Sequence, residues 1–157
     1  MTDDPKPLFL PIVVAGAIGA VILLSGLALF SYFEPVDAQP GNGNARITGV
    51  YRFDPITGDR VGASTARFTS RDVPAAVVDW KSLAPDIVVE AHWYDDNGEV
   101  LGGVGPAPAG GQPARPIPID VAPGDEIPAS AYVFVVERYS GGRSVQVLAR
   151  SAIKVDG

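Results

Sequence analysis

The sequence contains no cysteine in its 157 residues. Without thiols the chain cannot form disulfides, thiolate nucleophiles, iron–sulfur ligands or thiolate zinc sites, and it cannot carry a lipid on an N-terminal cysteine. A domain without disulfides is compatible with either side of a membrane. The absence therefore excludes several chemistries and leaves the compartment open.

Histidine and methionine are almost absent as well. His92 and Met1 are the only residues of their kinds, so sites built from several histidines and copper sites of the His/Met type are out of reach. The sequence therefore predicts no metal and no cofactor. It also disfavours a metallochaperone or an assembly factor that delivers a metal.

Positive charge is scarce: 12 Lys and Arg residues stand against 18 Asp and Glu residues, for a net charge of −6. Phosphate binding needs a basic face, so we expect no nucleic acid among the partners. The same deficit argues against polybasic attraction to lipid headgroups. The scattered charges are best interpreted as a source of solubility.

Apolar residues, by contrast, are concentrated near the N-terminus. The run LFLPIVVAGAIGAVILLSGLALFSYF, residues 8–33, contains no charged residue, and a bilayer core requires about 20 apolar residues in helical form. It predicts a transmembrane helix over residues 8–33 after a short tail, residues 1–7. Because Lys6 precedes the run and the next cation is Arg46, the positive-inside bias predicts a cytoplasmic N-terminus and a domain outside the cytoplasm.

A cleaved signal peptide is the alternative interpretation of this run. The segment VDA, residues 36–38, fits the small-x-small pattern of a cleavage site. Signal peptides, however, have apolar regions of about 7–15 residues after a basic segment. Here the apolar run is longer, and Asp3 and Asp4 outnumber Lys6 in the tail. These features favour a retained anchor in the lipid bilayer.

Small residues cluster within the predicted helix at spacings of three, four and seven. They are Ala15, Gly16, Gly19, Ala20 and Gly26. Helices in lipid associate by close packing, and small residues let their backbones approach. The pattern predicts a docking surface for another transmembrane helix, while the simpler alternative is that Gly and Ala are common in such helices.

The rest of the chain favours an all-β domain. Residues 34–44, EPVDAQPGNGN, are expected to form a linker, and the domain would span residues 45–157. Strand-like runs cover residues 46–53, 61–69, 75–80, 87–94, 100–104, 117–121, 131–139 and 144–155. About seven to eight strands predict an antiparallel β-sandwich of the immunoglobulin or fibronectin type, with a small barrel as the rival.

Two strands carry positional signals. Pro118 interrupts the run 117–121 and predicts an edge strand, because proline has no N–H to donate to a neighbouring strand. The segment YVFVV, residues 132–136, is apolar at every position, which predicts a central strand that is covered on both faces.

The segment GGVGPAPAGGQPARP, residues 102–116, is expected to be the longest irregular stretch. A Gly-rich run can cradle phosphate, but here no Gly-Lys-Ser/Thr and no helix follow it. A mobile or partner-contacting loop is the favoured interpretation.

The only histidine lies in VVEAHWYDDNGEV, residues 88–100. When Gly98 is aligned with the glycine of an EF-hand loop, Trp93 and Val104 fall at the two most important ligand positions, so this type of calcium site is rejected. An incidental, weak cation contact remains an alternative there. Asn97 and Gly98 instead predict a two-residue type I′ hairpin turn, which would place Trp93 opposite Gly102.

Strand alternation divides this segment into two faces. Val89, Ala91 and Trp93 are expected in the core, and Val88, Glu90, His92 and Tyr94 outside it. His92 has no nucleophile-elbow sequence to serve, since no G-x-S-x-G motif exists in the chain. Paired carboxylates of the glycosidase type stay open as an alternative from the sequence, but a sandwich of about 110 residues rarely encloses the cleft that they need. We therefore predict no enzymatic activity, and we name His92, Tyr94 and Arg115 as candidate partner-contact residues.

Together these features predict a non-enzymatic, single-pass accessory subunit of a larger membrane protein complex in the bacterial inner membrane. The layout is similar to that of single-pass accessory subunits in bacterial respiratory and photosynthetic assemblies. In this interpretation the partners are other membrane protein subunits, and the periplasmic domain contacts their outer surface. The alternative is a membrane-anchored binding module that acts alone on a carbohydrate or a protein.

Overall fold

The computed structural model describes residues 45–122 and 124–157. The predicted tail, the predicted transmembrane helix with its small residues, and the predicted linker all lie outside the described residues. In the part that is described, no helix has both the length and the apolar character needed to cross a bilayer.

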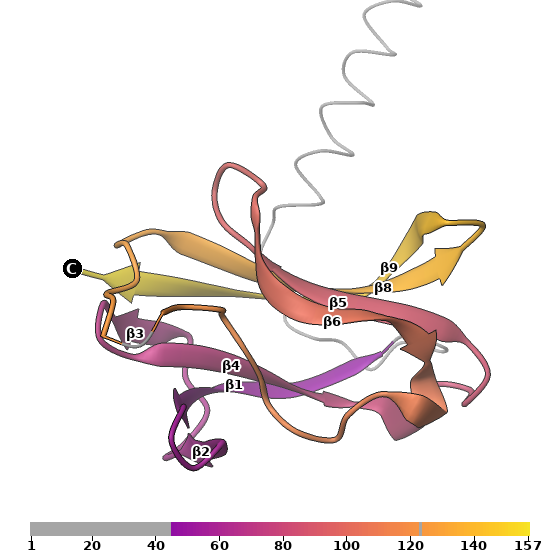
Figure 1. Cartoon of the computed structure of the whole chain (residues 1–157), viewed down its shortest axis with the longest axis horizontal. Helices are drawn as coiled ribbons and strands as arrows, with labels where there is room; N and C mark the ends of the chain where they lie inside the picture. The colour runs from indigo at the N-terminus through magenta and orange to yellow at the C-terminus, as the bar shows by residue number, and fades with distance from the viewer. Residues whose placement is uncertain (1–44, 123) are drawn as a thin grey trace, which may run out of the picture. The chain divides into compact units, whose positions relative to one another are not determined.

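Within residues 45–122 and 124–157, nine strands form two sheets that lie one above the other (Figure 1). The four-stranded sheet has the order β2-β1-β4-β7, and the five-stranded sheet has the order β3-β9-β8-β5-β6. The strands are β1 (Arg46–Asp54), β2 (Asp59–Val61), β3 (Arg67–Thr69), β4 (Val73–Asp79), β5 (Val88–Tyr94), β6 (Val100–Pro108), β7 (Ile117–Pro118), β8 (Ala131–Ser140) and β9 (Arg143–Asp156). Two short 3₁₀ helices, η1 (Trp80–Ser82) and η2 (Ala109–Gly111), complete the elements. The all-β prediction is confirmed.

The prediction of purely antiparallel pairing is wrong, because β3 and β9 run parallel. The single expected strand over residues 61–69 is in fact two short strands, and Gly62, with φ of 73°, lies between them. Antiparallel direction is commonly imposed by a tight hairpin turn. β3 and β9 lie far apart in the sequence and share no such turn, so no hairpin imposes an antiparallel direction on them.

One apolar core lies between the two sheets and draws on both. Trp93 on β5 is fully buried, and its ring lies 5.1 Å from that of Phe134 on β8. The indole Nε1–H of Trp93 donates to the carbonyl of Ile117 on β7, at 2.9 Å. This bond links the two sheets directly. The predicted core face of β5 is confirmed, since Val89, Ala91 and Trp93 are all buried.

The two positional predictions for strands are also confirmed. β7, which contains Pro118, is an edge strand of the four-stranded sheet, and β8 is the central strand of the five-stranded sheet. Val135 on β8 points away from the core, yet only 1 % of it is exposed. β8 is therefore covered on both faces at this position.

The expected irregular stretch over residues 102–116 is largely ordered, which corrects the prediction. β6 extends to Pro108 and pairs with β5, and η2 follows it. Proline is tolerated there because β6 is an edge strand. A register shift between Val89 and Ala91 widens the pairing, and the side-chain amide of Gln112 donates to the carbonyls of Val89 and Gly105, at 2.8 and 3.1 Å. Gln112 thus satisfies the backbone groups that the shift separates.

The predicted type I′ turn is wrong as well. Gly98 has φ of 81°, but no residue other than glycine has a positive φ in the described chain, so Asn97 does not adopt the conformation that a type I′ turn requires. The N–H of Gly98 donates to the carbonyl of Asp95, and the carboxylate of Asp95 accepts from the N–H groups of Asn97 and Glu99. The side chain of Asp95 therefore stabilises a longer turn. Val100 lies opposite Tyr94, whereas the predicted pairing of Trp93 with Gly102 would place Leu101 there.

Candidate functional site

The structure places the predicted partner-contact residues in two locations. His92 and Tyr94 lie on the outer face of the five-stranded sheet, with ring centroids 6.3 Å apart and an edge-on angle of 75°. Arg115 is exposed in the segment between η2 and β7, which leads into the other sheet. Ala15, Gly16, Gly19, Ala20 and Gly26 lie outside the described residues.

The outer face of the five-stranded sheet carries a group of three ionisable side chains that we call the polar cluster. It consists of Glu90 and His92 on β5 and Glu137 on β8, and one ligand atom from each lies within 4.8 Å of the others. Glu90 and Glu137 are directly opposite each other in the antiparallel pairing. Glu137 is only 5 % exposed, so the cluster is partly withdrawn from water.

Hydroxyl groups orient both carboxylates of the polar cluster. The hydroxyl of Tyr94 donates to Oε2 of Glu137, at 3.1 Å, and Oγ of Ser144 donates to Oε1 of Glu90. Because Tyr94 follows His92 by two residues, strand alternation brings it to the same face. Ser144 is the second residue of β9. The cluster and the hydroxyls that support it therefore come from three adjacent strands, β5, β8 and β9.

The imidazole of His92 is packed against the backbone of the neighbouring strand. Gly103 on β6 lies opposite His92, and a Cβ atom there would approach Cδ2 of His92 to 2.5 Å and the carbonyl oxygen of Ala91 to 2.2 Å. Only glycine leaves room for this approach. The position of the imidazole is therefore built into β6.

Sequence reasoning identified His92 but missed its two acidic neighbours as a group. Alternation already placed Glu90 on the face of His92. Glu137 was also detectable in principle, because it is the first charged residue after the apolar run 132–136. What the sequence lacked was the pairing of β5 with β8, which joins residues about 45 positions apart.

The outer face of the four-stranded sheet has a different character. Cross-strand pairs join Tyr51 to Ala75 and Phe53 to Val73 on this side, and Pro118 pairs with Ala75 from the edge. We call the half-buried residues Tyr51, Phe53, Val73, Val77 and Pro118 the apolar face. The guanidinium of Arg60 lies over the ring of Tyr51, 5.0 Å from its centroid.

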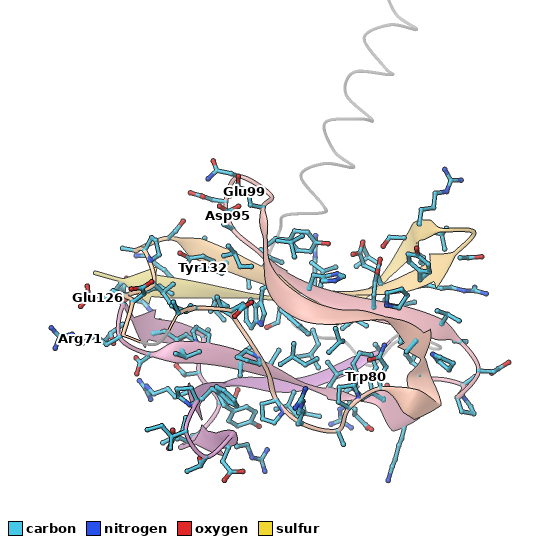
Figure 2. The ribbon with its side chains drawn as sticks, viewed as in Figure 1. Arg71, Trp80, Asp95, Glu99, Glu126 and Tyr132 are labelled. Carbon is cyan, nitrogen blue, oxygen red and sulfur yellow. The ribbon has the colours of Figure 1, made fainter. Side chains whose placement is uncertain are left out.

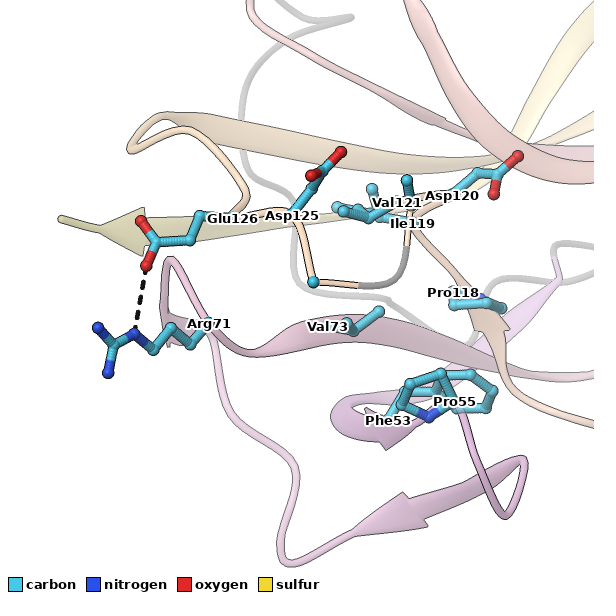
Figure 3. A pocket seen from close by; sticks show the side chains of 12 residues that line it. Phe53, Pro55, Arg71, Val73, Pro118, Ile119, Asp120, Val121, Asp125 and Glu126 are labelled. Atoms are coloured by element: carbon cyan, nitrogen blue, oxygen red, sulfur yellow. Dashed lines mark hydrogen bonds and ion pairs between the residues drawn. The ribbon is translucent and has the colours of Figure 1, made fainter.

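A groove of about 500 Å³ continues from the apolar face. Phe53, Pro55, Val73 and Pro118 form part of its wall, and Arg71 and Glu126 form an ion pair of 3.2 Å at one end, as Figure 3 shows. Figure 2 shows the same pair at the margin of the domain. An apolar wall with a charged end suits contact with an amphipathic protein surface.

Asp72 connects the two sheets electrostatically. Its carboxylate accepts from the N–H and Oγ1 of Thr69 on β3, at 2.8 and 2.9 Å, and from Nε of Arg52 on β1, at 3.0 Å. Partial burial alone would raise the pKa of Asp72, but the bonds from Thr69 and the charge of Arg52 together hold that pKa below its usual range.

Two further groups have shifted pKa values near the hairpin loop. The N–H of Glu99 is the main cause of the lowered pKa of Asp95, with smaller contributions from Asn97 and Gly98. Burial raises the pKa of Tyr132, and the negative charges of Asp96 and Asp95 add to the rise. In Figure 2, Asp95 and Glu99 lie together in the loop between β5 and β6.

Comparison with protein-family models, with curated proteins and with solved structures finds no match to this chain.

Proposed function

We propose that this chain is a non-enzymatic, single-pass accessory subunit of a bacterial membrane protein complex. The observation that carries the proposal is the uncharged run of residues 8–33, which is long enough to span a bilayer. The tail, residues 1–7, would be cytoplasmic, and the β domain would lie in the periplasm. A linker of eleven residues, residues 34–44, reaches at most about 40 Å, which would keep the domain close to the membrane.

We further propose that the β domain has immunoglobulin-type topology. The order β9-β8-β5-β6 matches strands G, F, C and C′ of such domains, and β1-β4-β7 matches A, B and E. The hydroxyl of Tyr132, near the start of β8, donates to the carbonyl of Pro128 at 2.7 Å. This bond corresponds to the tyrosine corner, and Trp93 corresponds to the buried tryptophan of strand C. Phe134 packs on Trp93 at the position where antibody domains have a cysteine.

The apolar face is the surface that we assign to partner contact. Its aromatic and β-branched side chains lie together on one sheet, and Ile56, which is 94 % exposed, follows in the adjoining turn. Apolar side chains gathered on one face are typical of sites that another protein covers. Aromatic residues such as Tyr51 and Phe53 contribute most in such contacts.

The experiment is purification of the tagged full-length protein from its native membrane in mild detergent, followed by identification of the proteins that remain bound. Gly19→Leu would obstruct close helix packing, and Phe53→Asp would place a charge on the apolar face. We expect each variant to lose the partner that the unaltered chain retains. Val145→Asp is the matched control, because Val145 is 49 % exposed on the other sheet.

The outcomes separate the two functions that the sequence allows. If Gly19→Leu and Phe53→Asp retain the same partners as the unaltered chain, the docking proposal is wrong. If the unaltered chain purifies alone and still binds a carbohydrate or a protein, the chain is an independent membrane-anchored module.

A further inference from the structure

We propose that the polar cluster binds one divalent transition-metal ion, for which Zn²⁺ is the probe. The ligands would be the imidazole of His92 and one carboxylate oxygen each from Glu90 and Glu137. This site goes beyond the accessory function proposed above and does not depend on it. It also departs from the expectation, drawn from the scarcity of histidine and cysteine, that the chain binds no metal.

The donor set fits a borderline metal ion. Imidazole and carboxylate are both zinc ligands, with bond lengths of about 2.0–2.2 Å, and three protein ligands leave a fourth position open. A tetrahedral site with such bonds has ligand atoms roughly 3.4 Å apart. The three ligand atoms lie within 4.8 Å of one another, so side-chain rotations of about an ångström would complete the site.

Burial and charge favour a cation at this place. Like charges directly opposite each other on neighbouring strands destabilise a sheet, and Glu90 and Glu137 are such a pair. Glu137 is also only 5 % exposed, and attraction between charges is stronger where water is excluded. A divalent ion between the two carboxylates would offset the repulsion between them.

The surroundings supply the outer support that metal sites have. Ligating carboxylates are usually held by further hydrogen bonds, and the hydroxyls of Tyr94 and Ser144 hold Glu137 and Glu90 in this way. The imidazole is fixed between the edge of the Tyr94 ring and Gly103. Ligands on two paired strands, β5 and β8, are placed more precisely than ligands on loops.

Arg150 is the rival source of positive charge. It is half-buried on β9, directly opposite Val135 on β8, and Val135 in turn lies opposite His92 on β5. If the guanidinium of Arg150 already neutralises the two carboxylates, added metal would not bind at the cluster. Titration with Zn²⁺ distinguishes these arrangements.

The test uses the full-length protein in detergent, treated with a chelator and carrying no histidine tag, titrated calorimetrically with ZnCl₂. We expect one saturable site. His92→Gln and Glu137→Gln should each weaken Zn²⁺ binding at least tenfold, and Tyr94→Phe about tenfold through loss of outer support. The matched control Glu99→Gln removes one exposed carboxylate outside the cluster and should change the affinity less than twofold. Mg²⁺ should bind far more weakly, because imidazole suits zinc better.

A second measurement distinguishes loss of a metal ligand from misfolding of a variant. The chain has one histidine, so the imidazole signals of the ¹⁵N-labelled protein belong to His92 alone, and they should shift in step with Zn²⁺ saturation. Absence of saturable binding or an unchanged His92 spectrum at saturation would each overturn the proposal. So would an affinity in His92→Gln and Glu137→Gln equal to that of the unaltered chain. Circular dichroism of every variant should match that of the unaltered chain.

Discussion

The two sheets contribute to the same core but differ in what they carry on the outside. The four-stranded sheet presents aromatic and β-branched side chains, such as Phe53 and Val73, beside a groove. The five-stranded sheet presents the polar cluster, in which Glu137 is nearly as buried as a core residue. The inner faces are similar because both must exclude water from a shared interior.

The inner faces of the sheets form the core, whereas the outer faces are where the proposed contacts lie. The inner residues of both sheets provide a contiguous apolar core, and neither outer arrangement is part of it. Half-buried apolar residues gathered on one outer face and a buried charged residue on the other are the two features that call for a specific explanation. Each sheet displays one of them, in keeping with the protein partner proposed for one face and the ion proposed for the other.

The largest effect is expected where the two sheets meet. Trp93→Ala removes the largest buried side chain and leaves the carbonyl of Ile117 without its indole donor. We expect the free energy of unfolding to fall by about 3–5 kcal/mol. Urea unfolding of the full-length protein in detergent, followed by circular dichroism, measures the change. Val145→Ala, at a half-exposed position of β9, should stay within about 0.5 kcal/mol; a similar loss in both variants would contradict a shared core.

A smaller effect is expected within the five-stranded sheet, where two glycines of β6 can be compared. Gly103→Ala would force a Cβ atom to within 2.2 Å of the carbonyl oxygen of Ala91, whereas nothing lies within 4 Å of a Cβ atom at Gly105. We expect Gly103→Ala to reduce the free energy of unfolding by about 1–3 kcal/mol, and Gly105→Ala to change it by less than about 0.5 kcal/mol. Equal effects in urea unfolding would show that His92 does not depend on Gly103.

Local sequence patterns predicted some features of the two sheets correctly and others wrongly. Period-two alternation identified the core face of β5, and Pro118 identified an edge, because both depend on local chemistry. The turn after Tyr94 was predicted wrongly because the Asn-Gly signal was outweighed by the carboxylate of Asp95, which accepts from Asn97 and Glu99. The ordered course of β6 was missed because Gly and Pro have low strand propensity, which pairing with β5 overrides.

The candidate sites were less accessible to sequence reasoning than the strands. Pairing between distant strands brings Glu137 next to Glu90 and His92, and it also gathers the residues of the apolar face. No local sequence pattern specifies that pairing. The direction of β3 beside β9 has the same origin. The sequence therefore predicts where strands lie but not which distant strands pair or in which register, and the candidate sites depend on that pairing.

An effect of intermediate to small size is expected at Tyr132, which connects β8 to the segment before it. Tyr132→Phe removes the bond to the carbonyl of Pro128 and should lower the free energy of unfolding by about 1 kcal/mol. Because the folded-state pKa of Tyr132 is raised, its contribution is complete below the usual tyrosine pKa of about 10 and is lost as pH rises through the folded-state value. The free energy of unfolding, measured from pH 8 to 11, should therefore fall less steeply in Tyr132→Phe than in the unaltered chain. Tyr139→Phe, at the other end of β8, is the control and should follow the unaltered chain.

The smallest effect is expected at Asp72, which joins β3 of one sheet to β1 of the other. Its folded-state pKa is lowered, so its contribution is present above the unfolded value of about 4 and is lost as pH falls through the folded-state value. Arg52 is 46 % exposed, and solvent screening should keep the loss in Asp72→Asn at neutral pH below about 1 kcal/mol. Between pH 7 and 2, the free energy of unfolding should depend less on pH in Asp72→Asn than in the control Glu126→Gln. In the unaltered chain, the carboxylate of Glu126 pairs with Arg71 at the exposed margin. Identical profiles would mean that the contact between the sheets at Asp72 contributes no stability, and that Trp93 and the apolar core alone hold the two sheets together.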